Sequence, residues 1–175
     1  NNYVAPSVTF GNSIKSIDSY AFAECHLIEQ AVLPETVTRI GDRAFLNCDS
    51  LRTFTFPQNS KEVEGWVFEG CDALTKVTLA KGTTSIGEST FNGCRRLSDI
   101  NLTDQTSLTT LNNYAFYGTA LKNVTLPNSI TEIGWAVFQD CNELESINVP
   151  TGIDYVPYDY CEDSEKLRSV QMHTS

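Results

Sequence analysis

Positive charge and histidine are both scarce in this sequence. Its 12 lysines and arginines stand against 22 aspartates and glutamates, which gives a formal net charge of -10. A chain of this charge repels phosphate backbones and anionic membrane surfaces, so we expect no nucleic-acid partner. The two histidines, His26 and His173, lie near opposite ends of the chain. A histidine-centred catalytic triad and a three-histidine metal site are therefore both excluded.

Long apolar runs are missing too. No run approaches the roughly 20 residues that a membrane-spanning helix needs, so we expect no insertion into a membrane. Residues 1–6 lack the basic and apolar regions of a signal peptide, and the sequence opens almost directly on its first expected strand. We interpret it as a piece of a longer chain. No glycine loop that could cradle a phosphate is present, so a nucleotide site is excluded and no cofactor is expected.

Phenylalanine, in contrast, recurs at a nearly fixed interval of 23 residues. The column consists of Phe22, Phe45, Phe68, Phe91, Phe116 and Phe138. A leucine column keeps the same interval, at Ile28, Leu51, Leu74, Leu97, Leu121, Leu144 and Leu167. Self-similarity of this length predicts a solenoid whose units bury their apolar faces only by stacking. We expect one domain over residues 1–175, built of about seven units, with residues 151–175 as a degenerate terminal repeat or cap.

One unit begins with a short extended segment. Leu51, Phe54 and Phe56 alternate as inward positions, and Pro57 ends the segment because it lacks a backbone donor. The same pattern in every unit predicts about eight short strands in one parallel sheet. A second apolar pair follows, and a glycine such as Gly41 or Gly87 suits a tight bend there. Residues 42–45 and their equivalents are expected to form a helical or 3-10 turn on the outer wall, which makes the fold class β-rich α/β.

Five of the six cysteines share one repeat position, three residues after a phenylalanine: Cys25, Cys48, Cys71, Cys94 and Cys141. Their side chains should point the same way from stacked layers about 4.8 Å apart. A disulfide needs converging vectors and β-carbons about 3.8 Å apart. We therefore predict a ladder of reduced, buried thiols that behave as small hydrophobes. Cys161 falls in the phenylalanine column and should also pack inward.

At these positions the chain resembles a known family. The pattern of Ile40, Gly41, Ala44, Phe45, Cys48, Leu51 and Pro57 is similar to that of the BspA-like leucine-rich repeats of bacterial surface proteins. The resemblance covers essentially the whole chain. It implies a right-handed coil with a concave sheet, an adhesion or protein-recognition role, and an extracellular or cell-surface location. Asp18 and Glu64 stand where other units have glycine, and Thr119 stands near the cysteine column.

The repeat is interrupted once. Two extra residues lie between Leu102 and Leu111, in the stretch 103–107, and one residue is missing before Leu121. Insertions in solenoids map to loops and sometimes form binding sites, but lengthening a loop costs little free energy. A binding loop and a merely tolerated bulge both remain open.

The open side of the sheet carries small polar side chains. Alternation along the strands turns outward Thr53, Thr55, Lys76, Thr78, Asp99, Asn101, Asn123, Thr125, Ser146 and Asn148. Threonine favours strands, and stacked threonine and asparagine can hydrogen-bond along the ladder, which would explain the rows without a ligand. The alternative is recognition of a polypeptide or a glycan.

Aromatic residues gather on the outer wall, at Tyr20, Trp66 and Tyr114, with Trp135 and Tyr158 one residue earlier in the unit. Packing over neighbouring turns and an exposed row of binding anchors are both open. The acidic group of Asp154, Asp159, Glu162, Asp163 and Glu165 lacks the order of a calcium loop, so we read it as a solvated cap and expect no metal. Cys25 and His26 are adjacent, but strand geometry turns one inward and the other outward.

No catalytic constellation emerges, and a uniform solenoid supplies no cleft, so we expect no enzyme. The leading hypothesis is a monomeric, non-enzymatic module that binds a protein or glycan ligand. The alternative is a structural spacer or assembly segment of a larger repeat protein.

Overall fold

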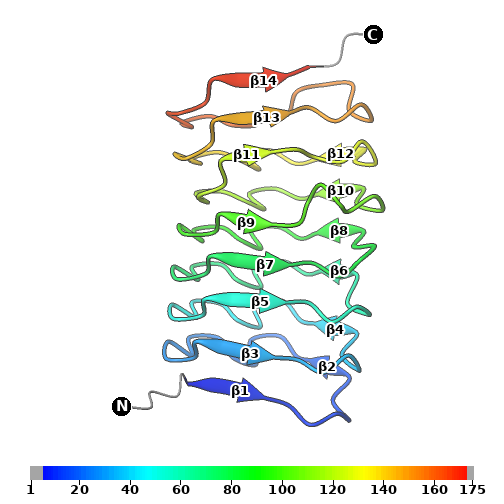
Figure 1. Cartoon of the computed structure of the whole chain (residues 1–175), viewed down its shortest axis with the longest axis vertical. Helices are drawn as coiled ribbons and strands as arrows, with labels where there is room; N and C mark the ends of the chain where they lie inside the picture. Colours follow the sequence, from blue (N-terminus) through cyan, green and yellow to red (C-terminus); the bar gives the residue numbers. More distant parts are fainter. Residues whose placement is uncertain (1–5, 173–175) are drawn as a thin grey trace.

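The computed structural model describes residues 6–172, in which the chain winds into a nearly straight column of stacked coils (Figure 1). One side of the column carries a strand from every coil. These strands are β1 (Ser7–Thr9), β3 (Gln30–Val32), β5 (Thr53–Thr55), β7 (Lys76–Thr78), β9 (Asp99–Ile100), β11 (Asn123–Val124), β13 (Ser146–Asn148) and β14 (Ser169–Gln171). All pair in parallel, and partners such as Thr53 and Lys76 are one repeat apart in sequence. The repeat interval therefore sets the register.

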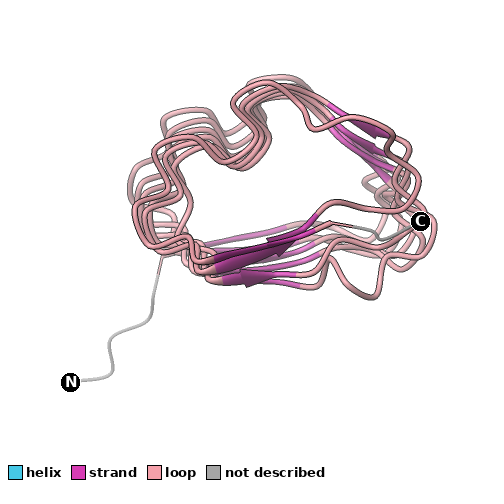
Figure 2. Ribbon diagram, turned by 90° about the horizontal axis from the view of Figure 1, so that it is seen from above, coloured by secondary structure: helices cyan, strands magenta, loops and turns pink. Residues whose placement is uncertain are grey.

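A second ladder runs along another side of the first six coils (Figure 2). It consists of two-residue strands: β2 (Ser16–Ile17), β4 (Arg39–Ile40), β6 (Glu62–Val63), β8 (Ser85–Ile86), β10 (Thr110–Leu111) and β12 (Glu132–Ile133). This ladder is split between β4 and β6, because β2 and β4 form one sheet and β6 to β12 another. The eight predicted strands and the parallel solenoid are confirmed. At this second side the sequence had indicated only apolar pairs and no strands. The first ladder is also split, into five strands from β1 to β9 and three strands from β11 to β14.

Phenylalanine rings fill the interior, as the repeat predicts. Phe45, Phe68 and Phe91 are fully buried, and consecutive rings in this series stack with centroids 5.7 Å apart. The last coil departs from the pattern because Tyr160 takes over the aromatic position. Its ring lies 5.7 Å from that of Phe138, while Cys161, expected to pack inward, is only half-buried.

The cysteines are unpaired, as predicted, and all six are free thiols. The structure adds a contact that the sequence did not reveal. The Cys71 Sγ donates to the Phe45 carbonyl oxygen at 3.1 Å, and the Cys94 Sγ donates to that of Phe68 at 3.1 Å. Burial raises the pKa of Cys48 to about 12 and that of Cys141 to about 11. These thiols therefore stay protonated and chemically inert at neutral pH.

The predicted helical turn on the outer wall is wrong, because the described residues contain consecutive turns and no helix there. Two residues per coil adopt positive φ, for example Arg43 at 56° and Asn47 at 54°. Left-handed residues interrupt a right-handed helix. Alternate N–H groups instead donate to the next coil, as Phe45 donates to the Val67 carbonyl oxygen at 3.0 Å. The outer wall is thus a hydrogen-bonded ladder of turns.

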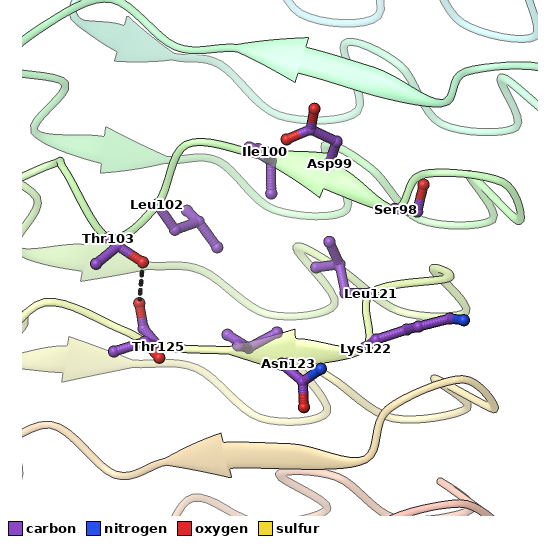
Figure 3. Close-up of a pocket in the computed structure, with 10 residues that line it drawn as sticks. Ser98, Asp99, Ile100, Leu102, Thr103, Leu121, Lys122, Asn123 and Thr125 are labelled. Atoms are coloured by element: carbon purple, nitrogen blue, oxygen red, sulfur yellow. Dashed lines mark hydrogen bonds between the residues drawn. The ribbon is translucent and has the colours of Figure 1, made fainter.

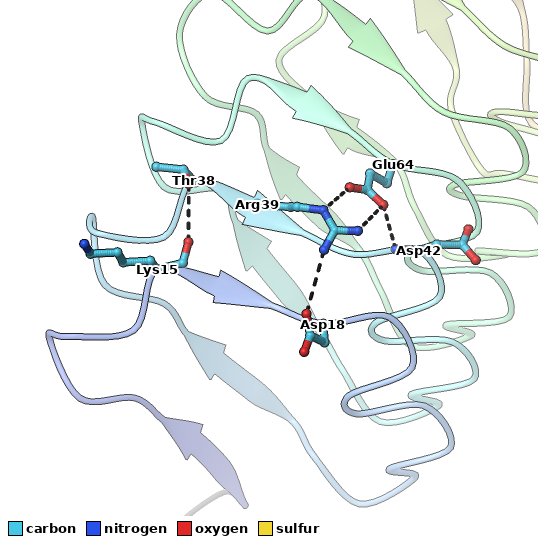
Figure 4. A network of polar contacts seen from close by, with 6 residues as sticks. All are labelled: Lys15, Asp18, Thr38, Arg39, Asp42 and Glu64. Carbon is cyan, nitrogen blue, oxygen red and sulfur yellow. Dashed lines mark hydrogen bonds and ion pairs between the residues drawn. The ribbon is translucent and has the colours of Figure 1, made fainter.

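The structure gives a reason for the glycines at the bend that the sequence did not indicate. No positive φ occurs at Gly41 or Gly87, but a β-carbon on Gly87 would lie 2.5 Å from the backbone of Glu64 and Gly65. At Gly41 and Gly87 the preceding coil lies too close for a β-carbon, which would come within 2.6 Å of its backbone. Asp18 and Glu64 occupy the glycine position in two other coils. The Arg39 guanidinium contacts both carboxylates, at 3.8 Å from Asp18 and 2.7 Å from Glu64 (Figure 4).

Candidate functional site

We define the strand face as the outward surface of the first ladder. All ten residues expected there lie on it, and each is exposed or half-buried. Outward residues of adjacent strands lie opposite one another, as Thr55 lies opposite Thr78 and Asn123 opposite Ser146. The structure therefore brings these residues onto one surface, as the alternation predicted.

Several of these side chains are already engaged within the chain. The Lys76 Nζ lies 2.6 Å from an Asp99 carboxylate oxygen, and the Ser146 hydroxyl donates to the Asn123 amide oxygen at 2.7 Å. Asn101 accepts from the Leu79 N–H at 2.7 Å and donates to the Leu79 carbonyl at 3.3 Å. Asn148 binds the Leu126 backbone in the same way. These two asparagines serve the ladder, which leaves the threonines as the accessible polar groups.

The strand face is interrupted between β9 and β11. The two strands belong to separate sheets, so no ladder joins them. The Leu102 N–H donates to the Ile100 carbonyl oxygen at 2.9 Å, whereas the N–H of Phe56, at the equivalent position, donates to the Thr78 carbonyl oxygen of the next coil. The two extra residues of this coil lie directly after this turn. The second ladder restores register at β10, which pairs with both β8 and β12.

This interruption, which we call the breach, is a cavity of about 330 Å³ (Figure 3). It is lined by Ser98, Asp99, Ile100, Leu102, Thr103, Leu121, Lys122, Asn123, Val124 and Thr125. One end is closed by the Ala120 N–H, which donates to the Leu97 carbonyl at 3.0 Å. The other end is closed by the Thr103 hydroxyl, which donates to the Thr125 carbonyl at 3.1 Å.

Only part of the breach was predicted as a binding surface. Asp99, Asn123 and Thr125 were expected on the strand face, and the remaining lining residues were missed. The irregular spacing around residues 103–107 was the signal that marked the place.

At the breach one inward apolar residue is partly exposed. Ile100 is half-buried, whereas Phe54 and Val77, its equivalents in earlier coils, are only 2% and 1% exposed. Apolar side chains therefore form the base of the cavity, and the polar side chains of Asp99, Lys122 and Asn123 lie at its rim. Such a combination suits a ligand with an apolar group and hydrogen-bonding neighbours.

The other candidate groups from the sequence are the histidines and the acidic cluster. The His26 Nδ1 lies 2.8 Å from an Asp49 carboxylate oxygen, on the exposed surface; His173 lies outside the described residues. Within residues 6–172 no cluster of three potential metal ligands occurs. In the acidic cap, the nearby Asp159 charge raises the pKa of Glu162, as expected for like charges in a solvated group.

The outer-wall aromatic residues divide into two sets. Tyr114 is half-buried and packs with its ring centroid 6.0 Å from that of Trp135. Trp66 is half-buried beneath the Arg43 guanidinium, 4.2 Å from the ring centroid. Tyr20, Trp135 and Tyr158 are exposed by 55%, 50% and 74%. Packing thus accounts for the first two residues and leaves the other three accessible.

Comparison with known sequences decides the family. The model for the BspA type leucine-rich repeat region matches residues 1–81 and 67–175, with six copies. The chain belongs to the BspA-type leucine-rich repeat family. The resemblance drawn from the repeat pattern is confirmed. No curated protein sequence matches this BspA-type chain significantly.

Solved structures with the same fold come from several bacteria. A leucine-rich repeat protein from Bacteroides ovatus is 26% identical, with a TM-score of 0.79, over 93% of this chain and 48% of that one. A leucine-rich repeat protein from T. pallidum is 25% identical, with a TM-score of 0.65, over 94% and 68%. A leucine rich cell surface protein from Faecalibacterium prausnitzii is 29% identical, with a TM-score of 0.58, over 80% and 45%. This BspA-type chain spans about half the length of the first and third of these proteins.

No helix capable of crossing a membrane occurs among residues 6–172.

Proposed function

We propose that this chain is a non-enzymatic recognition module of a surface or secreted protein, which binds a polypeptide through the strand face at the breach. The breach is the observation that carries the proposal. It separates the two sheets of the strand face, and it places apolar atoms beside the unjoined edges of β9 and β11.

A polypeptide fits this chemistry better than a glycan does. Strand edges without a partner offer backbone donors and acceptors, which an extended peptide can satisfy. The base at Ile100 and Val124 favours an apolar side chain. Within the described part of the chain, no aromatic ring of the kind against which sugars commonly stack lines the breach. The surface location is supported by the name of the Faecalibacterium relative and by the family.

Binding arrays of bacterial and host proteins and of glycans test the proposal, with the wild-type chain as the probe. Thr125→Arg would place a bulky charge at the breach, and Thr55→Arg would place one on the strand face away from it. Thr38→Arg, at an exposed position outside the strand face, is the matched control. We expect a protein ligand whose affinity falls at least about tenfold with Thr125→Arg. A ligand that covers the breach would have to bury the introduced charge and remove its water. Binding should remain unchanged in the control.

Three outcomes would count against the proposal. A glycan ligand would show that the chemistry of the partner is wrong. A protein ligand indifferent to Thr125→Arg would move the site away from the breach. Absence of any ligand would favour the alternative of a structural spacer in a longer repeat protein.

A further inference from the structure

The described part of the outer wall contains a complete site for a guanidinium group, and the chain fills it itself. The Arg43 guanidinium lies 4.2 Å from the Trp66 ring centroid and 5.6 Å from that of Tyr20. The neighbouring Asp42 carboxylate accepts a hydrogen bond from its Nη1. Trp66 belongs to the next coil and Tyr20 to the previous one, so the cation lies between two aromatic rings along the axis. Rings of this kind attract cations through their negative faces.

Two coils further on, the same positions recur without the cation. Glu88 stands where Asp42 stands, Tyr114 where Trp66 stands, and Ser89 where Arg43 stands. The backbone hydrogen bonds confirm this alignment, because the Arg43 N–H donates to Gly65 and the Ser89 N–H donates to Asn113, each in the following coil. Ser89 even keeps the backbone conformation, with φ 51° against 56° for Arg43. The carboxylate and the ring are thus repeated, and a serine replaces the guanidinium.

A hollow of about 450 Å³ lies at this second position. It is lined by Glu88, Ser89, Asn92, Tyr114, Tyr117 and Gln139. The Tyr114 and Tyr117 rings meet edge to face, with centroids 6.1 Å apart. Ser89 is 4% exposed and lies at the base, so a bound group would contact mainly the rings and the Glu88 carboxylate.

The charge around the hollow is mostly negative. Burial, and after it the charges of Asp140 and Asp163, raises the pKa of Tyr117. The Arg95 guanidinium opposes them, but it also lies 4.0 Å from an Asp72 carboxylate oxygen. Asn92 donates to the Glu69 carboxylate at 3.0 Å, which brings a further acid to the edge of the hollow. The field therefore favours a cationic ligand.

We infer that the hollow at Tyr114 and Tyr117 is a second binding site, which takes an arginine side chain of a partner polypeptide. The guanidinium stacks against the tyrosine rings and pairs with the Glu88 carboxylate, as Arg43 does with Trp66 and Asp42. The Asn92 and Gln139 amide nitrogens already donate to Glu69 and Glu162, so their amide oxygens accept from the backbone N–H groups of the adjacent peptide. This site lies on the outer wall and does not depend on the strand face.

Titration with short peptides tests the inference. The probes are acetyl-Gly-Gly-Arg-Gly-Gly-amide and the same peptide with citrulline, which is neutral but has nearly the same shape, or with lysine. The readout is the indole N–H signal of Trp135, whose ring lies 6.0 Å from that of Tyr114. We expect the arginine peptide to bind at least about fivefold more tightly than either comparison peptide, since cation-to-ring attraction favours the planar guanidinium.

Two variants locate the binding on the wall. Ser89→Arg should supply the missing cation from within the chain and abolish the response, whereas Thr38→Arg adds the same charge elsewhere and should leave it intact. Glu88→Gln, which removes only the carboxylate charge, should weaken binding of the arginine peptide about threefold or more and leave the citrulline peptide unaffected. Equal affinity for the arginine and citrulline peptides would overturn the inference, as would equal affinity for lysine or full binding by Glu88→Gln. The peptide titration does not depend on the breach, so the effect of Thr125→Arg on a strand-face ligand has no bearing on it. Either proposal can therefore be refuted without the other.

Discussion

Buried cysteines in this chain occupy a position that requires a small hydrogen-bond donor. Four of them donate through sulfur to a phenylalanine carbonyl of the preceding coil, at 3.1 to 3.2 Å. In the last coil, Ser164 stands at this position and its hydroxyl donates to the Phe138 carbonyl at 3.2 Å. Thr119 fills the position in the fifth coil and is 2% exposed. The sequence predicted that these residues act as small hydrophobes. The repeat spacing shows that they are buried, but it does not show which backbone carbonyl each thiol contacts.

Raised thiol pKa values make stability depend on alkaline pH. A buried thiol keeps its proton well above the ordinary pKa of 9.0, to about 12 for Cys48, while the unfolded chain loses it near 9.0. Above pH 9 the folded state therefore binds more protons than the unfolded state does, and stability falls as pH rises. Each such thiol lowers the free energy of unfolding by about 1.4 kcal/mol per pH unit between these limits.

We expect the free energy of unfolding, measured with urea, to be independent of the thiols below about pH 8. It should then fall steeply between about pH 9 and 10.5 as the thiols of the unfolded chain lose their protons. Cys94→Ser keeps a hydrogen-bond donor and removes one titrating group. The free energy of unfolding of this variant should therefore fall less steeply over this range, by about 1.4 kcal/mol per pH unit. An identical pH slope in the variant and the wild type would contradict the assignment of the slope to buried thiols.

At the scale of elements, the outer wall was the poorest prediction. Residues 42–45 have the composition of a helical turn, and nothing in Tyr20, Arg43 or Trp66 indicates a positive φ. Non-glycine residues enter that region only at a cost, so these residue types offer no reason to expect it. The hydrogen bonds to the next coil offset this cost, and they exist only once the coils are stacked. A local pattern could not contain that information.

Two glycines separate conformational strain from steric exclusion. Gly93 has φ of +72°, and a β-carbon added there would have its nearest contact 3.8 Å away, which is free of any clash. Gly93→Ala should cost about 1 kcal/mol, through backbone strain alone. A β-carbon on Gly87 would lie 2.5 Å from the backbone of the preceding coil, so Gly87→Ala should force the coils apart and cost about 3 kcal/mol or more. Urea unfolding of both variants measures the difference; similar losses would show that close approach is not the reason for Gly87.

At the scale of the whole molecule, the column was predictable because every coil repeats the same inward positions. Phe45 and Phe91 identified the core, and alternation around Phe54 and Val77 identified the strand face. The breach was predictable as a place, from the insertion, but not as a cavity. The cavity depends on whether the Leu102 N–H donates to the next coil or to Ile100, and spacing does not encode that choice.

The breach should also be the weakest point of the strand face. In the first ladder, inward residues direct their N–H groups to the next coil, as Phe56 donates to Thr78 and Val149 donates to Gln171, both at 2.9 Å. The Ile100 N–H points the same way, toward β11, with which β9 forms no ladder. An amide outside a ladder exchanges its hydrogen without waiting for the column to unfold.

Hydrogen exchange followed by NMR should therefore give the Ile100 amide a rate at least about tenfold above those of Phe54 and Val77, which lie in the paired part of the same sheet. Leu111 is a control from the same coil, because β10 pairs on both sides and its amide should remain protected. If Ile100 is as protected as Val77, the two sheets are joined in solution and the breach cannot admit a ligand. If Leu111 exchanges as quickly as Ile100, the whole fifth coil opens, and the weak point is the coil rather than the strand face.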